Sequence, residues 1–228
     1  MGTTGPVRGF PAAALILTLS GAHGVWAAEP PGDRPPLRPL DTEARWGPGK
    51  VRALAEEIRR PLPGAWIVPS PDHPVTVTAS SFQTWRDRRY VPDNLVDGDY
   101  RTAWVENENG TGVGQWVEFS FATPTAGRLH GLVLVPGFAR NAGMFANNPR
   151  PRALGLSWRC GDMAAEAILR PQDRRGAQAF ILPPGWALSP AAPCSLRLTI
   201  RGVFPGARFA DTSLSEVVLV VAQAAGAD

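Results

Sequence analysis

Short apolar runs of period two, interrupted by glycine and proline, constrain the fold of this chain more than any other feature. The chain has 228 residues, among them 24 glycines and 24 prolines. Eight runs have the alternation, or the short apolar stretch, of a β-strand. They span residues 75–78, 115–121, 130–135, 153–158, 167–169, 179–182, 195–201 and 217–221. No long helical pattern separates them, so the sequence predicts an all-β antiparallel sandwich or jelly roll.

The last runs and the loops between strands indicate where the core and a binding site should lie. In residues 195–201, Leu196, Leu198 and Ile200 alternate with polar residues, which predicts that these three side chains face the core. The loops after Trp104 and after Pro136 are long and polar. Because binding residues concentrate on loops held by a rigid scaffold, we expect a binding site there.

The first 27 residues predict a secretory signal. Arg8 precedes a short apolar stretch at residues 10–19, and small residues around Ala27 suit cleavage before residue 28. The apolar stretch is too short to span a bilayer, and no later segment reaches the roughly 20 apolar residues that a span needs. An uncleaved membrane anchor is the alternative. The sequence therefore predicts export, to the periplasm or outside the cell, without a transmembrane anchor.

The region before the first strand divides into a linker and a helix. Residues 28–48 are rich in proline and predict a linker that contributes little to a core. Residues 49–60 predict a helix, because apolar side chains recur on one of its faces (Val51, Leu54, Ala55 and Ile58). This helix and its connector, to residue 73, either pack on the domain or present a surface to a partner. Residues 74–223 would form the β domain.

The charge of the chain indicates which partners to expect, and its cysteines indicate the compartment. The formal net charge is +3, the only lysine is Lys50, and no block of like charges is five residues long, so we expect no nucleic acid partner. Cys160 and Cys194 form an isolated pair, which in an oxidising compartment indicates one disulfide. Closing a loop of about 35 residues stabilises a fold by roughly 3–4 kcal/mol in the chain-entropy model. Two free buried thiols are the alternative.

Residues 94–104 concentrate oxygen ligands around one turn. Asp97 and Asp99 flank Gly98, and Thr102 follows closely. Calcium is usually held by carboxylate, hydroxyl and backbone carbonyl oxygens folded around such a turn. The alternative is an Asp-Gly turn between strands whose carboxylates are solvated.

Several motifs, taken in order, resemble a known family. They lie at residues 78–82, 90–99, 102–106, 110–116, 137–141, 147–150 and 211–217. Together they resemble a discoidin-like (galactose-binding-like) jelly roll, and in particular the NADase-type glycan-binding domain found on some bacterial NAD glycohydrolases. The resemblance spans about residues 74–221. Its most specific part is the combination of Asp97-Gly98-Asp99 with the closing Asp211-Thr-Ser-Leu-Ser-Glu216.

The resemblance implies a non-catalytic, carbohydrate-binding β-sandwich, to which the pattern of residues 49–60 adds a short N-terminal helix. It also implies a structural calcium ion that ties the early turn to the last strand. Carried over to this sequence, the calcium ligands are Asp97, Asp99, Thr102 and Glu216, with a backbone carbonyl near Asn94. One departure is Pro149, which precedes Arg150 and changes how the loop presents that arginine.

Glycan recognition combines an aromatic face with polar groups that bind hydroxyls or an acidic group. The two long loops supply the candidate contacts, namely Glu106, Asn107, Arg140, Asn141, Phe145, Asn147, Asn148 and Arg150. Phe145 is the predicted platform for a sugar ring, because it lies in an otherwise polar loop. Trp104 and Trp116 flank strand patterns and are predicted core residues. Trp85 either lines a second face or is a surface tryptophan stacked by arginine.

The sequence offers little that could perform catalysis. His73 and His130 have no recognisable nucleophile or metal-ligand spacing beside them. Glu106 and Glu108 could form a glycosidase pair, but two residues on one loop give no control over carboxyl separation. We therefore predict a binding protein and not an enzyme. A second hypothesis is an envelope scaffold or adaptor that binds a protein partner, with residues 49–60 as the docking helix.

Overall fold

The computed structural model describes residues 35–40, 49–190 and 192–224. These ranges belong to one compact unit that begins at Pro31. The predicted signal peptide and most of the predicted linker lie outside the described residues. No helix in the described ranges is long and apolar enough to cross a membrane.

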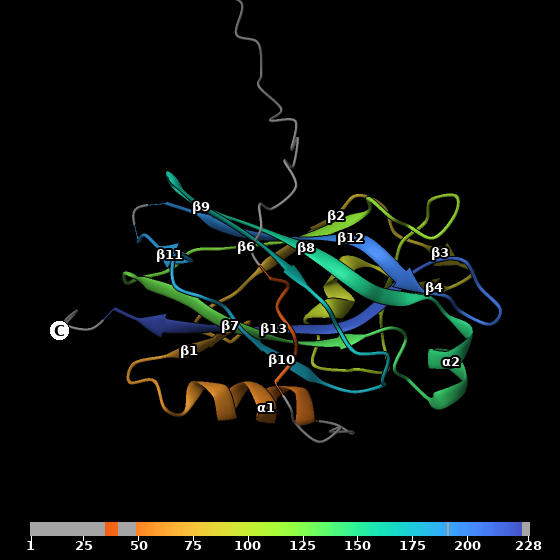
Figure 1. Ribbon diagram of the computed structural model, residues 1–228, viewed down its shortest axis with the longest axis horizontal. Helices are drawn as coiled ribbons and strands as arrows, with labels where there is room; N and C mark the ends of the chain where they lie inside the picture. The colour runs from red at the N-terminus through yellow and green to blue at the C-terminus, as the bar shows by residue number, and fades with distance from the viewer. Residues whose placement is uncertain (1–34, 41–48, 191, 225–228) are drawn as a thin grey trace, which may run out of the picture. The chain divides into compact units, whose positions relative to one another are not determined.

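Two antiparallel sheets face each other and enclose the main hydrophobic core (Figure 1). The five-stranded sheet has the order β2 (Thr76–Ala79), β6 (Trp116–Phe121), β12 (Cys194–Phe204), β8 (Arg150–Cys160) and β9 (Met163–Leu169). The six-stranded sheet has the order β1 (Trp66–Val68), β13 (Ser213–Gln223), β7 (Gly127–Pro136) and β10 (Gln178–Ile181), with β5 (Trp104–Val105) paired to β13 and β11 (Ala187–Leu188) paired to β7. The prediction of a discoidin-like antiparallel sandwich is confirmed.

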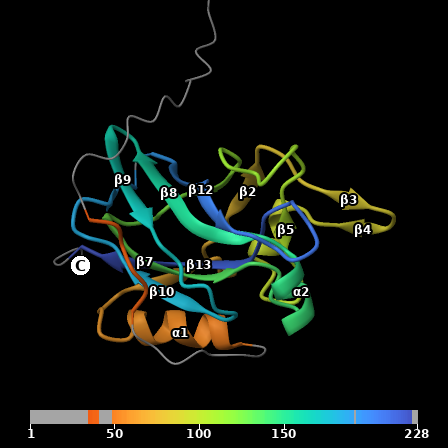
Figure 2. The ribbon, with the colours of Figure 1, turned by 45° about the vertical axis from the view of Figure 1, so that its right-hand side comes forward.

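All eight predicted strands are present, with ends that differ from the sequence patterns by at most four residues. The short strands β1, β5 and β11 were not predicted, nor was the hairpin of β3 (Thr84–Trp85) and β4 (Arg88–Arg89). A short helix, α2 (Ala142–Asn147), occurs in the loop predicted after Pro136, and a 3₁₀ helix, η1 (Pro92–Leu95), occurs where no element was predicted. Figure 2 shows α2 and the projecting β3–β4 hairpin at the same end of the sandwich.

Strand alternation explains which side chains enter the core. Leu196, Leu198 and Ile200 are each at most 1 % exposed, as predicted. Trp104 is also buried, but the prediction for Trp116 is wrong. Val117 and its alternating neighbours fill the inner face of β6, so Trp116 lies on the outer face of that strand. There the Arg197 guanidinium lies 4.0 Å from the ring centre of Trp116.

The N-terminal helix packs on the domain. This helix, α1 (Lys50–Arg59), buries Leu54, Ala55 and Ile58 in a second apolar cluster with residues of β7, β10 and β13. Figure 1 shows it lying along the outer side of the six-stranded sheet. The sequence left open whether this helix packs on the domain or presents a surface to a partner. Its apolar face packs on the domain, because the sheet covers it.

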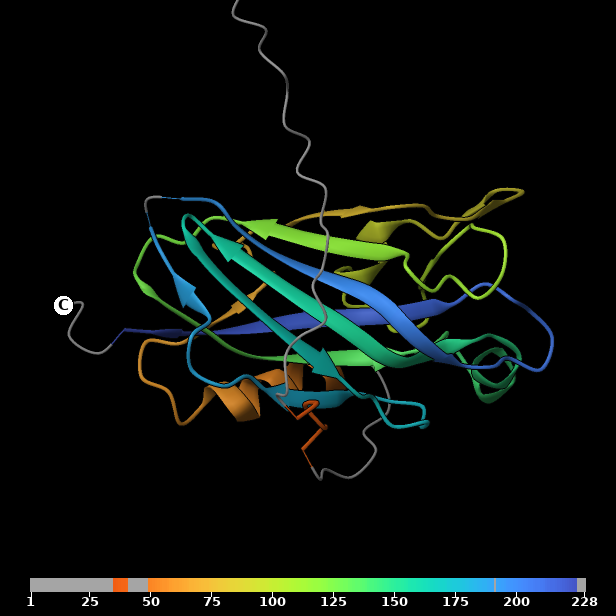
Figure 3. The same cartoon turned by 45° about the horizontal axis from the view of Figure 1, so that its top comes forward.

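Residues 35–40, which we call the N-terminal strap, connect the edges of the two sheets. The backbone N–H of Leu37 donates to Ile168 at 2.7 Å, and its carbonyl accepts from the N–H of Arg170 at 2.9 Å. The N–H of Leu40 donates to the carbonyl of Ala179 in β10 at 2.8 Å. Figure 3 shows the strap beside β9 and β10. Leu37 also packs against the main core, so the predicted linker does contribute to it at this point.

The predicted disulfide is confirmed. Cys160 and Cys194 are bonded and stand opposite each other in the register of β8 and β12. Both cysteines are buried beside the core, where Trp158 is one of the largest enclosed side chains.

Candidate functional site

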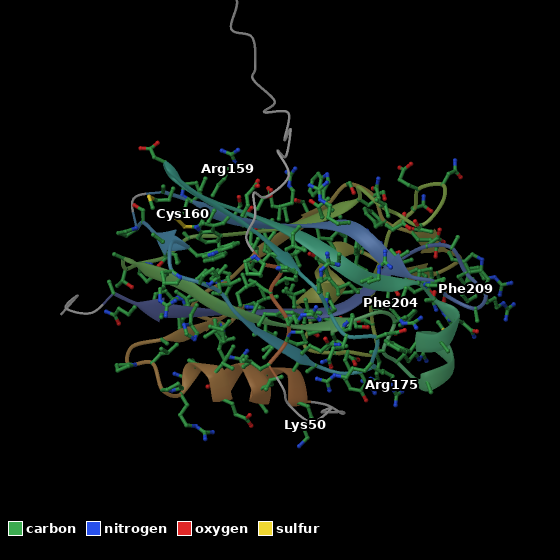
Figure 4. All side chains as sticks on the ribbon, in the orientation of Figure 1. Lys50, Arg159, Cys160, Arg175, Phe204 and Phe209 are labelled. Atoms are coloured by element: carbon green, nitrogen blue, oxygen red, sulfur yellow. A yellow bond between two sulfur atoms is a disulfide. The ribbon has the colours of Figure 1, made fainter. Side chains whose placement is uncertain are left out.

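A cavity of about 460 Å³ opens at the end of the sandwich that carries α2 and the β3–β4 hairpin. We call it the aromatic pocket. Val105, Phe138 and Met144 contribute apolar surface to it. Trp85 comes from the hairpin, and Phe209 comes from the loop between β12 and β13. Figure 4 labels Phe209 at this end of the molecule.

Two of the four aromatic side chains that line the pocket are exposed. Trp85 is 52 % exposed and Phe209 is 44 % exposed. Each is stacked by a neighbouring arginine, with Arg86 4.6 Å from the Trp85 ring centre and Arg208 5.3 Å from that of Phe209. Tyr90 packs edge-on against Phe138 at 5.8 Å between ring centres. Exposed rings stacked in this way present flat apolar faces at a reduced cost of ordering them on binding.

Polar groups line the same pocket. The Gln83 amide donates to Asp211 at 2.8 Å. Asn148 is 6 % exposed and donates through Nδ2 to the Met144 carbonyl at 2.8 Å. Arg88 and Arg208 also line the pocket, and within the described ranges neither forms an ion pair. The pocket therefore combines apolar faces with an amide pair, a carboxylate and two guanidinium groups.

Backbone contacts with α2 fix the loop that carries Arg208 and Phe209. The Asn147 carbonyl accepts from the N–H groups of Arg208 at 3.1 Å and Phe209 at 3.0 Å. Gly206 lies so close to the backbone of Asn147 and Asn148 that a β-carbon would overlap them. A glycine at this position is therefore what lets the loop pack against the helix.

The predicted glycan contacts are distributed differently from the expectation. Asn148 lines the pocket. Asn141 accepts from the N–H of Met144 at 2.8 Å and so caps α2, while Asn147 holds the neighbouring loop. Phe145 lies against Arg150, whose guanidinium is 4.7 Å from the ring centre. Arg150 also forms a bidentate ion pair with Asp173, at 2.5 and 2.8 Å. Neither Phe145 nor Arg150 lines the pocket.

The remaining three predicted contacts also lie outside the pocket. Asn107 and Arg140 are exposed. Glu106 is fully buried, and its carboxylate accepts from the backbone N–H groups of Thr212 and Glu108, both at 2.9 Å. Burial raises the pKa of Glu106. Its carboxylate thus stabilises the loop after β5, and in this conformation it neither reaches a ligand nor pairs with Glu108.

Sequence reasoning missed most of the pocket. Gln83, Arg88, Tyr90, Phe138, Met144, Arg208, Phe209 and Asp211 were not proposed as contacts. One signal could have found Phe209. It is an aromatic residue in a polar loop between two strands, which is the argument that selected Phe145.

The predicted calcium ligands do come together at the turn after η1. The Thr102 hydroxyl oxygen lies 2.8 Å from Asp97 Oδ2, 2.8 Å from the Asp99 carbonyl and 3.4 Å from the Asn94 carbonyl, and its single proton is donated to one of them at a time. The Asp99 carboxylate turns away to Arg101, which forms two bonds of 2.8 Å with it and holds its pKa down. Only the backbone carbonyl of Asp99 therefore faces Thr102.

Glu216 on β13 reaches the same turn from the far end of the sequence. It is 2 % exposed, and its Oε2 accepts no hydrogen bond within the described part of the chain. Burial, together with the negative charge of the neighbouring Asp97, raises the pKa of Glu216 to about 8. No group of three or more histidine, cysteine, aspartate or glutamate side chains that could hold a metal occurs in the described ranges. Two carboxylates, a hydroxyl and backbone carbonyls nevertheless fit the oxygen ligands that calcium takes, because calcium does not require a purely carboxylate site.

The two sheets, their order and the loop-end pocket define the class of protein as a discoidin-like β-sandwich. Residues 70–220 match the family model described as NAD glycohydrolase translocation F5/8 type C domain, and the chain belongs to this family. No curated protein matches the chain.

Solved structures of the same fold are numerous, with 115 similar chains. One is the family 32 carbohydrate-binding module of NanJ from Clostridium perfringens, solved with galactose. It aligns with a TM-score of 0.50 at 14 % identity over 68 % of this chain and 98 % of that chain. Another is a Clostridium perfringens ZmpB chain with two family 32 modules and an M60 catalytic domain. It aligns with a TM-score of 0.51 at 11 % identity over 82 % of this chain and 17 % of that chain. At these identities the likeness shows the fold.

Proposed function

We propose that this protein is a non-catalytic carbohydrate-binding module that holds a glycan in the aromatic pocket. The observation that carries the proposal is the pair of exposed rings, Trp85 and Phe209, on a cavity of about 460 Å³. An aromatic face suits the apolar C–H side of a sugar ring. The galactose complex of the NanJ module is consistent with this use of the fold.

Polar side chains at the pocket would orient the sugar through hydrogen bonds to its hydroxyls. The Gln83–Asp211 pair offers donors and acceptors to vicinal hydroxyls, and Asn148 offers its amide oxygen. Arg88 and Arg208 add donors at the rim. We expect the affinity to come from the rings and the choice of sugar to come from these polar groups.

A binding role without catalysis is consistent with the structural contacts of Glu106, His73 and His130. The Glu106 carboxylate is buried and occupied by two backbone N–H groups. The His73 ring stacks on Trp66 at 5.2 Å, and His130 is hydrogen-bonded to Arg128 at 2.9 Å. Each of these groups already has a structural partner.

Calcium would have a structural role in this module. Asp97, Glu216 and Thr102 would hold the ion with side-chain oxygens, and Asn94 and Asp99 would contribute backbone carbonyls. Glu216 lies on the last strand, so the ion would tie the early turn to β13. The buried, unpartnered Oε2 of Glu216 supports this proposal, because an unpaired carboxylate oxygen is costly to bury without a cation.

We further propose that the module is exported. A disulfide persists in oxidising compartments such as the periplasm or the extracellular space. The alternative of a scaffold that docks a protein through α1 has less support, because the apolar face of this helix is covered by the six-stranded sheet.

The test is a glycan array followed by titration of the sugars that bind. Trp85→Ala and Phe209→Ala each remove one exposed ring, and we expect each to weaken binding by about tenfold or more. Phe82→Ala is the matched control, because Phe82 is 41 % exposed but does not line the pocket. Binding that survives both pocket substitutions, or a folded protein that binds no glycan, would contradict the proposal.

A further inference from the structure

A second cavity, of about 230 Å³, lies where the N-terminal strap meets the ends of β8, β9 and β12. We call it the arginine groove. Three arginines line it: Arg38 from the strap, Arg152 from β8 and Arg170 just after β9. Phe204, at the end of β12, lines it as well and is labelled in Figure 4. The groove shares no lining residue with the aromatic pocket.

The groove is positively charged, because three arginines and no carboxylate line it. None of the side chains that line it is acidic, and its three arginines form no ion pair within the described ranges. Two other arginines of the same sheet behave differently, since Arg150 pairs with Asp173 and Arg197 pairs with Glu118. All three arginines are exposed, and the like charge that they bring to one cavity favours an anionic ligand there.

The walls of the groove are held in place from both sides. Backbone hydrogen bonds of Leu37 with Ile168 and Arg170, and of Leu40 with Ala179, fix the strap on either side of Arg38. Gln172, two residues beyond Arg170, is held by the side chain of buried Gln178, which accepts from the N–H of Gln172 at 2.8 Å and donates to the Gln172 carbonyl at 3.0 Å. Such positioning reduces the entropy that a ligand must remove on binding.

The size and the apolar walls of the groove indicate more than a small inorganic ion. A volume of about 230 Å³ is several times the roughly 30 Å³ that one water molecule occupies in the liquid. The Phe204 ring and the prolines Pro39 and Pro171 also line the groove. A ring with one apolar side and one acidic group would use both the arginines and these walls.

We propose that the arginine groove binds an acidic sugar residue, with its carboxylate or sulfate between Arg152 and Arg170 and with Arg38 closing the site from the strap. The groove exists only with the strap in place, since Arg38 and Pro39 belong to it. This inference is independent of the glycan proposed for the aromatic pocket.

The experiment is a titration of the folded, ¹⁵N-labelled whole chain with methyl β-D-glucuronide, followed by NMR. Methyl β-D-glucoside, which lacks the carboxylate, and inorganic sulfate, which lacks the ring, are titrated in parallel. We expect the glucuronide to shift the amide signals of Arg170, Gln172 and Phe204 in a saturable way, and the glucoside to leave them unchanged. Equal binding of the glucoside would overturn the proposal. Sulfate that binds as tightly as the glucuronide would show a site for a free oxyanion and overturn the sugar assignment.

Variants assign the binding to the groove. The double substitution Arg152→Gln and Arg170→Gln is expected to weaken glucuronide binding by about tenfold or more. The control, Lys50→Gln with Arg60→Gln, removes the same net charge from exposed positions at the ends of α1 and should leave binding unchanged. Trp85→Ala should also leave it unchanged, which separates a failure here from a failure of the aromatic pocket. Equal affinity of the wild-type chain and the Arg152/Arg170 variant would contradict the assignment.

Discussion

The Glu106 carboxylate shows how one side chain determines the course of a functional loop. It links the end of β5 to Thr212, just before β13, because its Oε1 accepts a hydrogen bond from the backbone N–H of Thr212 with an N to O distance of 2.9 Å. Thr212 is fully buried, so Glu106→Ala leaves its N–H without a partner and without access to water. An unsatisfied buried donor costs about 1–3 kcal/mol. We expect the free energy of unfolding in urea to fall by that amount.

Glu108→Ala is the control for this prediction. Glu108 is exposed two residues away and contributes only a backbone N–H, which the substitution keeps. Its loss should leave the free energy of unfolding within about 0.5 kcal/mol of the wild type. Equal stability of the two variants would show that the Glu106 bridge contributes nothing.

His130 gives the protein a sensitivity to acid. Burial lowers its pKa from 6.5, and the positive charge of Arg128, whose guanidinium donates to Nδ1 at 2.9 Å, lowers it further. The unfolded chain therefore binds more protons than the folded chain below pH 6.5, so stability is lost as the pH falls through this range. His130→Gln should remove that component. The check is the free energy of unfolding at several pH values between 5 and 8, and parallel curves for the two proteins would contradict it.

The pocket residues could be predicted only in part, because the direction in which single side chains point was not predictable. Sequence reasoning chose Phe145 as the platform because it is aromatic and lies in a polar loop. The loop contains the helix α2, which turns Phe145 toward Arg150 and puts Met144 and Asn148 on the pocket side. The direction of a side chain on a six-residue helix depends on tertiary packing, and local sequence does not specify it.

At the scale of elements, the strap stabilises two edge strands at once. Leu37 packs against the main core and pairs with β9, whereas Leu40, in the same segment, is 38 % exposed. Leu37→Ser should lower the free energy of unfolding by about 1–2 kcal/mol because it removes buried apolar surface. Leu40→Ser is the matched control and should have little effect. Urea unfolding of both variants checks this, and an equal effect would show that the strap is not packed as described.

Long strands were predictable and short ones were not. β6 and β12 have several periods of alternation, which a sequence pattern can report. The strands β3, β4, β5 and β11 have two residues each, too few for any period. Of these, β3, β4 and β5 position Trp85, Arg88 and Val105 at the aromatic pocket. The part of the fold that builds the pocket is therefore the part that carries the weakest sequence signal.

At the scale of the whole molecule, the proposed calcium ion would join segments that are far apart in the chain. Asp97 and Thr102 precede most of the sandwich, and Glu216 belongs to its last long strand. Removing calcium with EDTA should lower the melting temperature, because the buried Glu216 then faces Asp97 without a cation. A ligand at about 100 times its dissociation constant stabilises the folded state by roughly 2.7 kcal/mol.

Asp97→Asn tests whether this effect comes from the proposed site. The substitution removes one carboxylate from the ligand set and also relieves the repulsion that Asp97 exerts on Glu216. We therefore expect the variant to melt at the same temperature in calcium and in EDTA. Asp162→Asn, at an exposed position between β8 and β9, should keep the full calcium dependence of the wild type. A wild-type melting temperature that does not change between calcium and EDTA would show that the turn and β13 are joined without a metal. In that case the Glu216 carboxyl, whose pKa is about 8, would instead be protonated and hydrogen-bonded at neutral pH.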